Sequence, residues 1–238
     1  MTRETPSHAS PASPRIARRA LALTALLASG LLVWMALPRL QASVQYLPVD
    51  TAISRYRASG EVPFSQLPAL QARAVAAAAR YPHYRYFDGL SFLLYLQALD
   101  TDAPRAERLE ALRASLAAAN QAVLRAPAKP ATWLRIARIR SALGQGDDAV
   151  VPPLKMSILT GRVEPTLLLP RLELGLRYLR ALDAESVALL RDQAVLTWRV
   201  EPRRFSQALK LQRLDLEQVK SLLGSANAGL IAELEATL

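Results

Sequence analysis

The sequence predicts an all-α protein in which one apolar N-terminal helix precedes a helical domain, and three observations lead to this prediction. Ala, Leu and Arg, which are strong helix formers, are abundant. Apolar residues recur at i, i+3 and i+4, whereas alternating β-branched runs, typical of strands, are absent. An uncharged stretch near the start is long enough for a membrane span. We therefore expect a tether and one domain within the 238 residues.

The first element is a basic tail over residues 1–19, rich in Pro, Ser and Thr, which we expect to be disordered. Residues 20–37, ALALTALLASGLLVWMAL, then carry no charge. As a helix they extend about 27 Å, close to the roughly 30 Å of a bilayer's hydrocarbon core. Trp34 lies where an interfacial aromatic residue is expected, and Pro38 closes the segment. We interpret residues 20–37 as a transmembrane helix in contact with lipid.

Two other interpretations of the apolar segment remain open. A cleaved signal peptide needs small residues at its cleavage site, and Leu40-Gln41-Ala42 is a poor version of that pattern. A buried core helix would be apolar on one face, whereas here apolar residues cover the whole circumference.

The basic residues that flank the segment predict its orientation. Arg15, Arg18 and Arg19 crowd its start, and only Arg39 lies equally close to its end. This bias favours a cytoplasmic N-terminus, although the more distant Arg55 and Arg57 reduce the asymmetry. We expect a single-pass protein of a bacterial inner membrane with its C-terminal domain in the periplasm.

Residues 38–67 are expected to form a linker partly packed on the domain, because Pro48, Gly60 and Pro63 interrupt it. A short helix from about 50 to 58 fits between these breaks. The domain proper, 68–238, reads as a series of helices separated by Pro and Gly. With the shorter helices near the end, nine or ten are expected, and Pro170 should break or kink one of them.

The most informative stretch begins at Pro130. Trp133, Ile136 and Ala137 fall on one helical face, and LGQG at 143–146 forms a turn. Asp147 or Asp148 could cap a second helix, whose regular part is expected to begin near Pro152. The pattern predicts an antiparallel helix pair.

This pair resembles a tetratricopeptide repeat, a helix-turn-helix unit of 34 residues. Trp133 occupies the first large position of the repeat, Ala137 a small position and Ala149 the small position of the second helix. Pro153, Gly161 and Arg140 depart from the pattern. A plain helical hairpin is the alternative. The resemblance implies a tetratricopeptide-like stack of antiparallel helix pairs, with Arg138 pointing into a groove that holds a partner. A solvent-facing arginine is the alternative for Arg138.

The whole chain is similar to the single-span, tetratricopeptide-like envelope proteins of bacterial exopolysaccharide biosynthesis, the VpsP family. The similarity rests on the tether, the Trp133 unit, LKMSILTGRVEPTLLLPRLELGLRYLRAL at 154–182, and LTWRVEP at 196–202. It implies a membrane-anchored scaffold that helps organise polysaccharide synthesis or export by protein–protein interaction. An assembly subunit of another envelope complex, such as a secretion or division machine, is the alternative.

Catalytic and cofactor motifs are not found in the sequence. The chain lacks Cys, which excludes disulfides, thiolate nucleophiles and Cys-ligated zinc. Neither a zinc-protease motif, a phosphate-binding loop nor a nucleophile elbow occurs. The net charge of +10 is spread along helices, which argues against nucleic acid and fits anionic lipid or an acidic polymer. We expect no enzyme and no cofactor.

Overall fold

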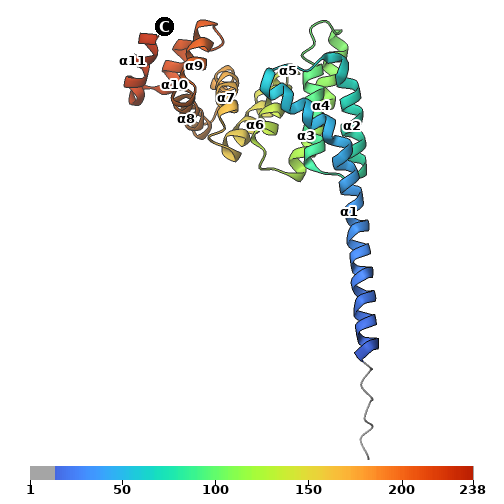
Figure 1. The fold of residues 1–238 in the computed structure, drawn as a ribbon. Helices are drawn as coiled ribbons and strands as arrows, with labels where there is room; N and C mark the ends of the chain where they lie inside the picture. Colours follow the sequence, from blue (N-terminus) through green and yellow to red (C-terminus); the bar gives the residue numbers. More distant parts are fainter. Residues whose placement is uncertain (1–13, 238) are drawn as a thin grey trace, which may run out of the picture.

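The computed structural model describes residues 14–237, and eleven α-helices but no strand lie in that range, so the all-α prediction is confirmed (Figure 1). The helices are α1 (Pro14–Ser59), α2 (Leu67–Arg80), α3 (Tyr84–Gln97), α4 (Arg105–Arg125), α5 (Pro130–Ala142), α6 (Asp147–Thr160), α7 (Pro165–Arg177), α8 (Ala184–Val200), α9 (Pro202–Lys210), α10 (Leu216–Leu223) and α11 (Ala228–Thr237).

Consecutive helices pack as antiparallel pairs, which stack side by side from α1 at one end to α11 at the other (Figure 1). The pairs are α1 with α2, α3 with α4, α5 with α6, and α7 with α8. Contacts between α1 and α3 and between α5 and α7 join one pair to the next. This is the stack that the repeat resemblance predicted.

Helix α1 is one continuous helix of 46 residues, and its first half projects from the domain as a stalk (Figure 1). Within the described residues it is the one helix long and apolar enough to cross a membrane, and the most apolar part has no buried residue. Residues 14–19, predicted as disordered tail, belong to α1. The rest of the predicted tail, 1–13, lies outside the described residues.

The linker predicted for residues 38–67 is wrong over most of its length. The helix neither ends at Pro38 nor restarts near Asp50 but runs through both Pro38 and Pro48. Each proline removes a helical hydrogen bond, at a cost of about 3 kcal/mol. Burial offsets this cost, because the second half of α1 is part of the domain core rather than a connection. Its fully buried residues face α2 and α3; they are Ala42, Tyr46 and Val49.

Close approach of α1 to α3 depends on Gly89. A Cβ atom there would collide with the Tyr46 hydroxyl, so Gly leaves the room that this ring occupies against α3. The hydroxyl donates to the Arg85 carbonyl at 3.0 Å. Tyr46 and Tyr86 also pack at a centroid distance of 4.8 Å. These contacts fix the stalk rigidly to the domain.

The α5–α6 pair forms where the sequence predicted it, but α6 begins earlier than Pro152. Its cap is Gly146, whose carbonyl accepts from the Ala149 and Val150 amides at 3.0 and 3.3 Å. Asp147 lies in the first turn, where a negative charge suits the helix dipole. Likewise α7 continues through Pro170.

Candidate functional site

Alternate helices α1, α3 and α5 present one face of the stack, and an ionic contact holds α3 to α5. Asp88 of α3 accepts from Thr132 Oγ1 at 2.6 Å and from Arg135 Nη1 at 2.9 Å. The same guanidinium donates to the Asp88 carbonyl at 2.9 Å. Thr132 is buried and Arg135 is nearly so, whereas the Asp88 side chain is 29% exposed, so the contact is partly shielded from water.

The charge of Asp88 is stabilised by this arrangement. Burial by itself would raise the pKa of its carboxyl, but the charge of Arg135 and hydrogen bonds from Thr132 and Arg135 outweigh burial. Arg57 of α1 acts in the same direction, so the Asp88 pKa lies below its ordinary value. Asp88 is therefore an internal counter-ion and is ionised at neutral pH.

Arg135 of this ion pair also belongs to a set of neighbouring rings and guanidinium groups, which we call the cation–aromatic row: Tyr56, Phe92, Arg135, Tyr95 and Arg138. Tyr56 of α1 meets Phe92 of α3 edge to face, with centroids 5.3 Å apart. The Arg135 Cζ lies 5.3 Å from the Phe92 centroid, and the Arg138 Cζ lies 5.7 Å from that of Tyr95. Three helices thus contribute to one polar and aromatic surface.

Arg138 is the member of the row with charge available to a partner. Its side chain is exposed, and among the described residues it forms no ion pair. Arg135 differs, because Asp88 already neutralises it. A guanidinium stacked on a ring is well placed to hold a carboxylate in two parallel hydrogen bonds. The neighbouring rings offer faces for flat or apolar groups.

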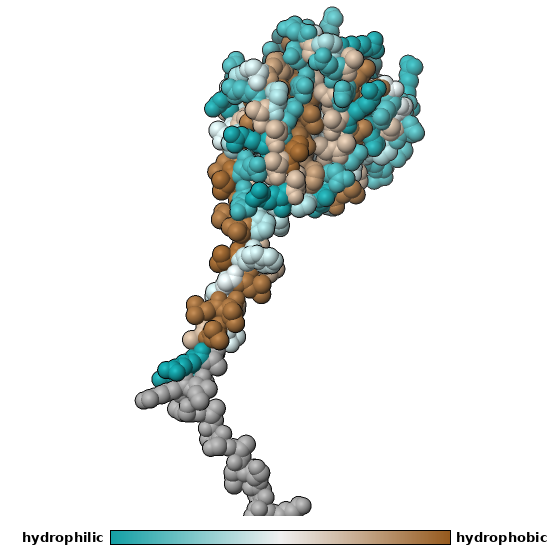
Figure 2. Space-filling view, turned by 90° about the vertical axis from the view of Figure 1, so that its right-hand side faces the viewer, coloured by the Kyte–Doolittle hydropathy of each residue, from teal (hydrophilic) through white to brown (hydrophobic). Residues whose placement is uncertain are grey.

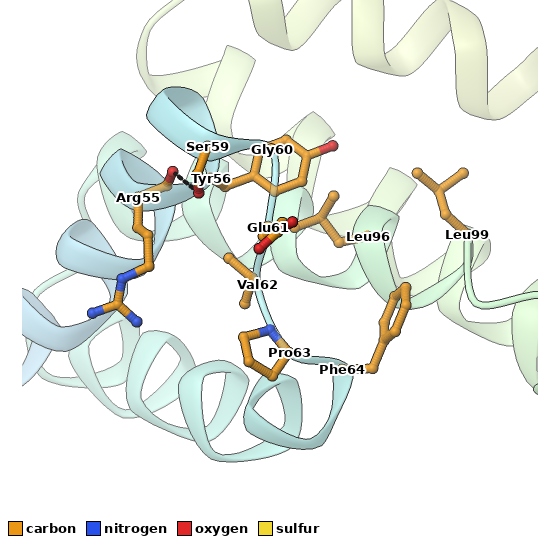
Figure 3. Close-up of a pocket in the computed structure, with 10 residues that line it drawn as sticks. All are labelled: Arg55, Tyr56, Ser59, Gly60, Glu61, Val62, Pro63, Phe64, Leu96 and Leu99. Carbon is orange, nitrogen blue, oxygen red and sulfur yellow. Dashed lines mark hydrogen bonds between the residues drawn. The ribbon is translucent and has the colours of Figure 1, made fainter.

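A cavity of about 590 Å³ adjoins one end of the row (Figure 3). Tyr56 belongs to both, and the cavity is also lined by Leu96 of α3 and by Leu99 in the turn that follows α3. The segment 60–64 after α1 forms the opposite wall, and the Phe64 ring points toward Leu99 (Figure 3). The cavity, whose lining includes Arg55 and Glu61 besides the apolar residues, lies at the Tyr56 end of the row, and Arg138 lies at the other end. This arrangement suits an extended segment with one apolar and one anionic group.

The residues predicted from the repeat pattern have packing roles, apart from Arg138. Ile136 and Ala137 are buried at the contacts of α5 with α4 and α6. Trp133 is half-buried, and its indole donates to the Pro127 carbonyl at 2.6 Å. Ala149 is half-buried, and its carbonyl accepts from Arg140 at 2.8 Å.

Sequence reasoning did not find the aromatic half of the row. Phe92, Tyr95 and Leu99 recur at i, i+3 and i+7, a pattern that also describes a core-facing stripe. The pairing of Tyr95 with Arg138 joins residues 43 positions apart, which no local pattern reveals. His83, the one histidine described, caps α3 by accepting from the Arg85 amide at 3.4 Å. Within residues 14–237, no three acidic, His or Cys side chains gather to hold a metal.

Comparison with family models, curated proteins and solved structures finds no match to this chain. The role proposed below therefore rests on the geometry of α1 and of the cation–aromatic row, together with the sequence resemblance.

Proposed function

We propose that this chain is a membrane-anchored scaffold of bacterial exopolysaccharide synthesis or export, which acts by binding other proteins of that complex. The observation that supports it most directly is the continuity of α1, which is exposed and apolar in one half and part of the domain core in the other. A helix of this kind holds a domain at a membrane surface without a flexible joint.

The domain begins to contact α1 almost at the end of the apolar segment. The guanidinium of Arg80 donates to Gln41, and Arg39 lies 6.0 Å from the Tyr81 ring. From Leu37 to Gln41 the helix rises only about 6 Å, so the C-terminal end of α2 lies at the level of the lipid headgroups. The cation–aromatic row then stands at a fixed height above the bilayer.

The row favours an extended protein segment with a carboxylate and an apolar or aromatic group as the bound partner. Arg138 would hold the carboxylate, and the cavity beside Tyr56 would take the apolar group. The link to polysaccharide comes from the sequence resemblance, and the periplasmic placement from the arginine bias before residue 20. Both are parts of the proposal.

Reversing the charge of Arg138 tests whether the cation–aromatic row binds a partner. Arg138→Glu should lower the amount of surface polysaccharide several-fold while leaving the thermal midpoint of the protein within a few degrees of wild type, since the side chain is exposed. Arg113→Glu, an exposed arginine of α4 away from the row, is the matched control. Normal polymer in the Arg138 variant would dismiss the role of this surface.

Deleting the gene and quantifying surface polysaccharide tests the function as a whole. Unchanged polymer together with a defect in secretion or division would assign the chain to another envelope complex. Protease added to spheroplasts should digest the domain. A domain cut only by a protease inside the cell would overturn the periplasmic placement.

A further inference from the structure

An apolar stripe continues along α1 past the end of the apolar segment, on the side away from the domain. Leu40, Val44 and Leu47 are 60%, 58% and 57% exposed. They alternate with Ala42, Tyr46 and Val49, which are buried against α2 and α3. Figure 2 shows hydrophobic side chains along the stalk up to the base of the domain. The two faces of this helix segment are therefore both apolar, and the described domain covers only one.

Lipid does not reach the far end of the stripe. Leu47 lies ten residues beyond Leu37, or about 15 Å along the helix. The headgroup layer adds only about 5–7 Å to each side of the hydrocarbon core. A row of large apolar side chains at that height faces water unless a protein surface covers it.

The spacing of the stripe identifies the kind of surface that fits. Leu40, Val44 and Leu47 stand at intervals of four and three, as in the heptad repeat of a coiled coil. The same register extends back through the apolar segment without interruption. It places Leu23, Gly30, Leu37 and Val44 at a positions and Leu26, Val33, Leu40 and Leu47 at d positions.

We propose that a second copy of this chain covers the stripe, so that two α1 helices form a parallel coiled coil from the membrane to the base of the domains. This proposal rests on the membrane anchoring proposed above, because two copies inserted with the same orientation are necessarily parallel. Identical heptad stripes are self-complementary across a twofold axis. Gly30 provides the small residue that lets helices approach closely within a bilayer.

Charge placement agrees with a parallel pair. In this register Asp50 stands at a g position and Arg55 at the following e position. Parallel coiled coils bring the g residue of one helix next to the following e residue of the other, so Asp50 of one copy meets Arg55 of the second. Asp50 also binds Arg85 of its own chain, which leaves each carboxylate between two guanidinium groups. The domains lie on the opposite face of each helix and are not obstructed.

Cysteine cross-linking tests the pairing, because the 238 residues of the chain include no cysteine. Val44→Cys, Leu40→Cys and Leu47→Cys should each give a disulfide-linked dimer of most of the protein when native membranes are treated with a mild oxidant. Gln45→Cys is the matched control. It is one residue from Val44 but turned by about 100° around the helix, where two Cys residues are too far apart for a disulfide.

A second measurement does not depend on cross-linking. In detergent the wild-type chain should have the mass of two copies by light scattering, and Val44→Glu should have the mass of one with unchanged helical content. Monomeric wild-type protein, or cross-linking at Gln45 equal to that at Val44, would overturn the dimer. Carbonate extraction tests the anchor separately: release of the wild-type chain would overturn the proposed function, whereas an anchored monomer would overturn the dimer alone.

Discussion

Arg171 is the one described charged residue that is fully buried, and it is satisfied without a carboxylate. Its guanidinium donates to Ser157 Oγ and to the Gly161 carbonyl at 2.9 Å each, and to the Ser157 carbonyl at 2.5 Å. A further bond reaches Gln193 Oε1 at 3.1 Å. Burial lowers the pKa of Arg171 to about 10, so it is still charged at neutral pH. One side chain thus joins α6, α7 and α8.

Removing this side chain should destabilise the stack between α6 and α8. Arg171→Ala removes the donor to the buried Ser157 carbonyl and to the partly buried Gly161 carbonyl and opens a cavity, and we expect the free energy of unfolding to fall by about 3–5 kcal/mol. Arg177→Ala, on the exposed face of the same helix, should cost less than about 1 kcal/mol. Urea unfolding followed by circular dichroism measures both. Equal free energies of unfolding for the two variants would show that Arg171 does not stabilise the packing of α6, α7 and α8.

The sequence does not distinguish Arg171 from an ordinary surface arginine. It follows Pro170 in an amphipathic run, and its partners are mostly backbone carbonyls, which have no sequence signature. Ile136 and Ala137 were predictable as core residues because their burial follows from local helical spacing. Residues that act across helices, such as Arg171, Tyr95 and Asp88, are defined only once the helices are placed.

At the scale of elements, the largest differences between the predicted and the observed helices occur at prolines. Pro38, Pro48, Pro152 and Pro170 were each expected to limit a helix, yet α1, α6 and α7 continue through them. In α1 the missed signal was the spacing of Ala42, Tyr46 and Val49 at i, i+4 and i+7. Tertiary burial outweighs local helix propensity when a whole face is packed.

The contact between α3 and α5 should depend on pH. Because the folded-state pKa of Asp88 is below its ordinary value, its stabilisation is present above about pH 4 and is lost as pH falls through the lowered pKa. Asp88→Asn should therefore reduce the free energy of unfolding by about 1–2 kcal/mol at pH 7. The difference in the free energy of unfolding between wild type and Asp88→Asn should become smaller toward pH 3.

Thermal unfolding of both proteins at pH 7, 5 and 3 measures this dependence. Asp147→Asn, an exposed acidic residue in the first turn of α6, serves as the control. A difference between wild type and Asp88→Asn that stays constant over this pH range would contradict the ion-pair role of Asp88.

At the scale of the whole molecule, α1 combines the anchor and the first helix of the stack. Its apolar half was predictable from composition alone, because the absence of charge over residues 20–37 needs no tertiary information. The all-α class and the pairing near Trp133 were predictable from periodicity. That the membrane tether and the first core helix are one helix was not predictable, since this depends on contacts of α1 with α2 and α3.

Two truncations separate these roles. A chain of residues 38–238 keeps every α1 residue that is buried in the core, so we expect it to leave the membrane and unfold cooperatively near the wild-type midpoint. A chain of residues 60–238 loses Tyr46, Val49 and the bond to Arg85. Burial of a large apolar side chain contributes about 1.5–3 kcal/mol. The loss of roughly 4–6 kcal/mol is a large part of the about 5–15 kcal/mol by which a typical domain is stable.

The two truncated chains are compared by gel filtration and by thermal unfolding followed with circular dichroism. The longer one should elute as a compact species with a sharp transition, and the shorter one should aggregate or melt at much lower temperature. Matching transitions would mean that residues 38–59 serve only as a linker, as the prolines first indicated. The height of the cation–aromatic row above the membrane would then no longer be fixed by α1, and the scaffold role would lose its main structural support.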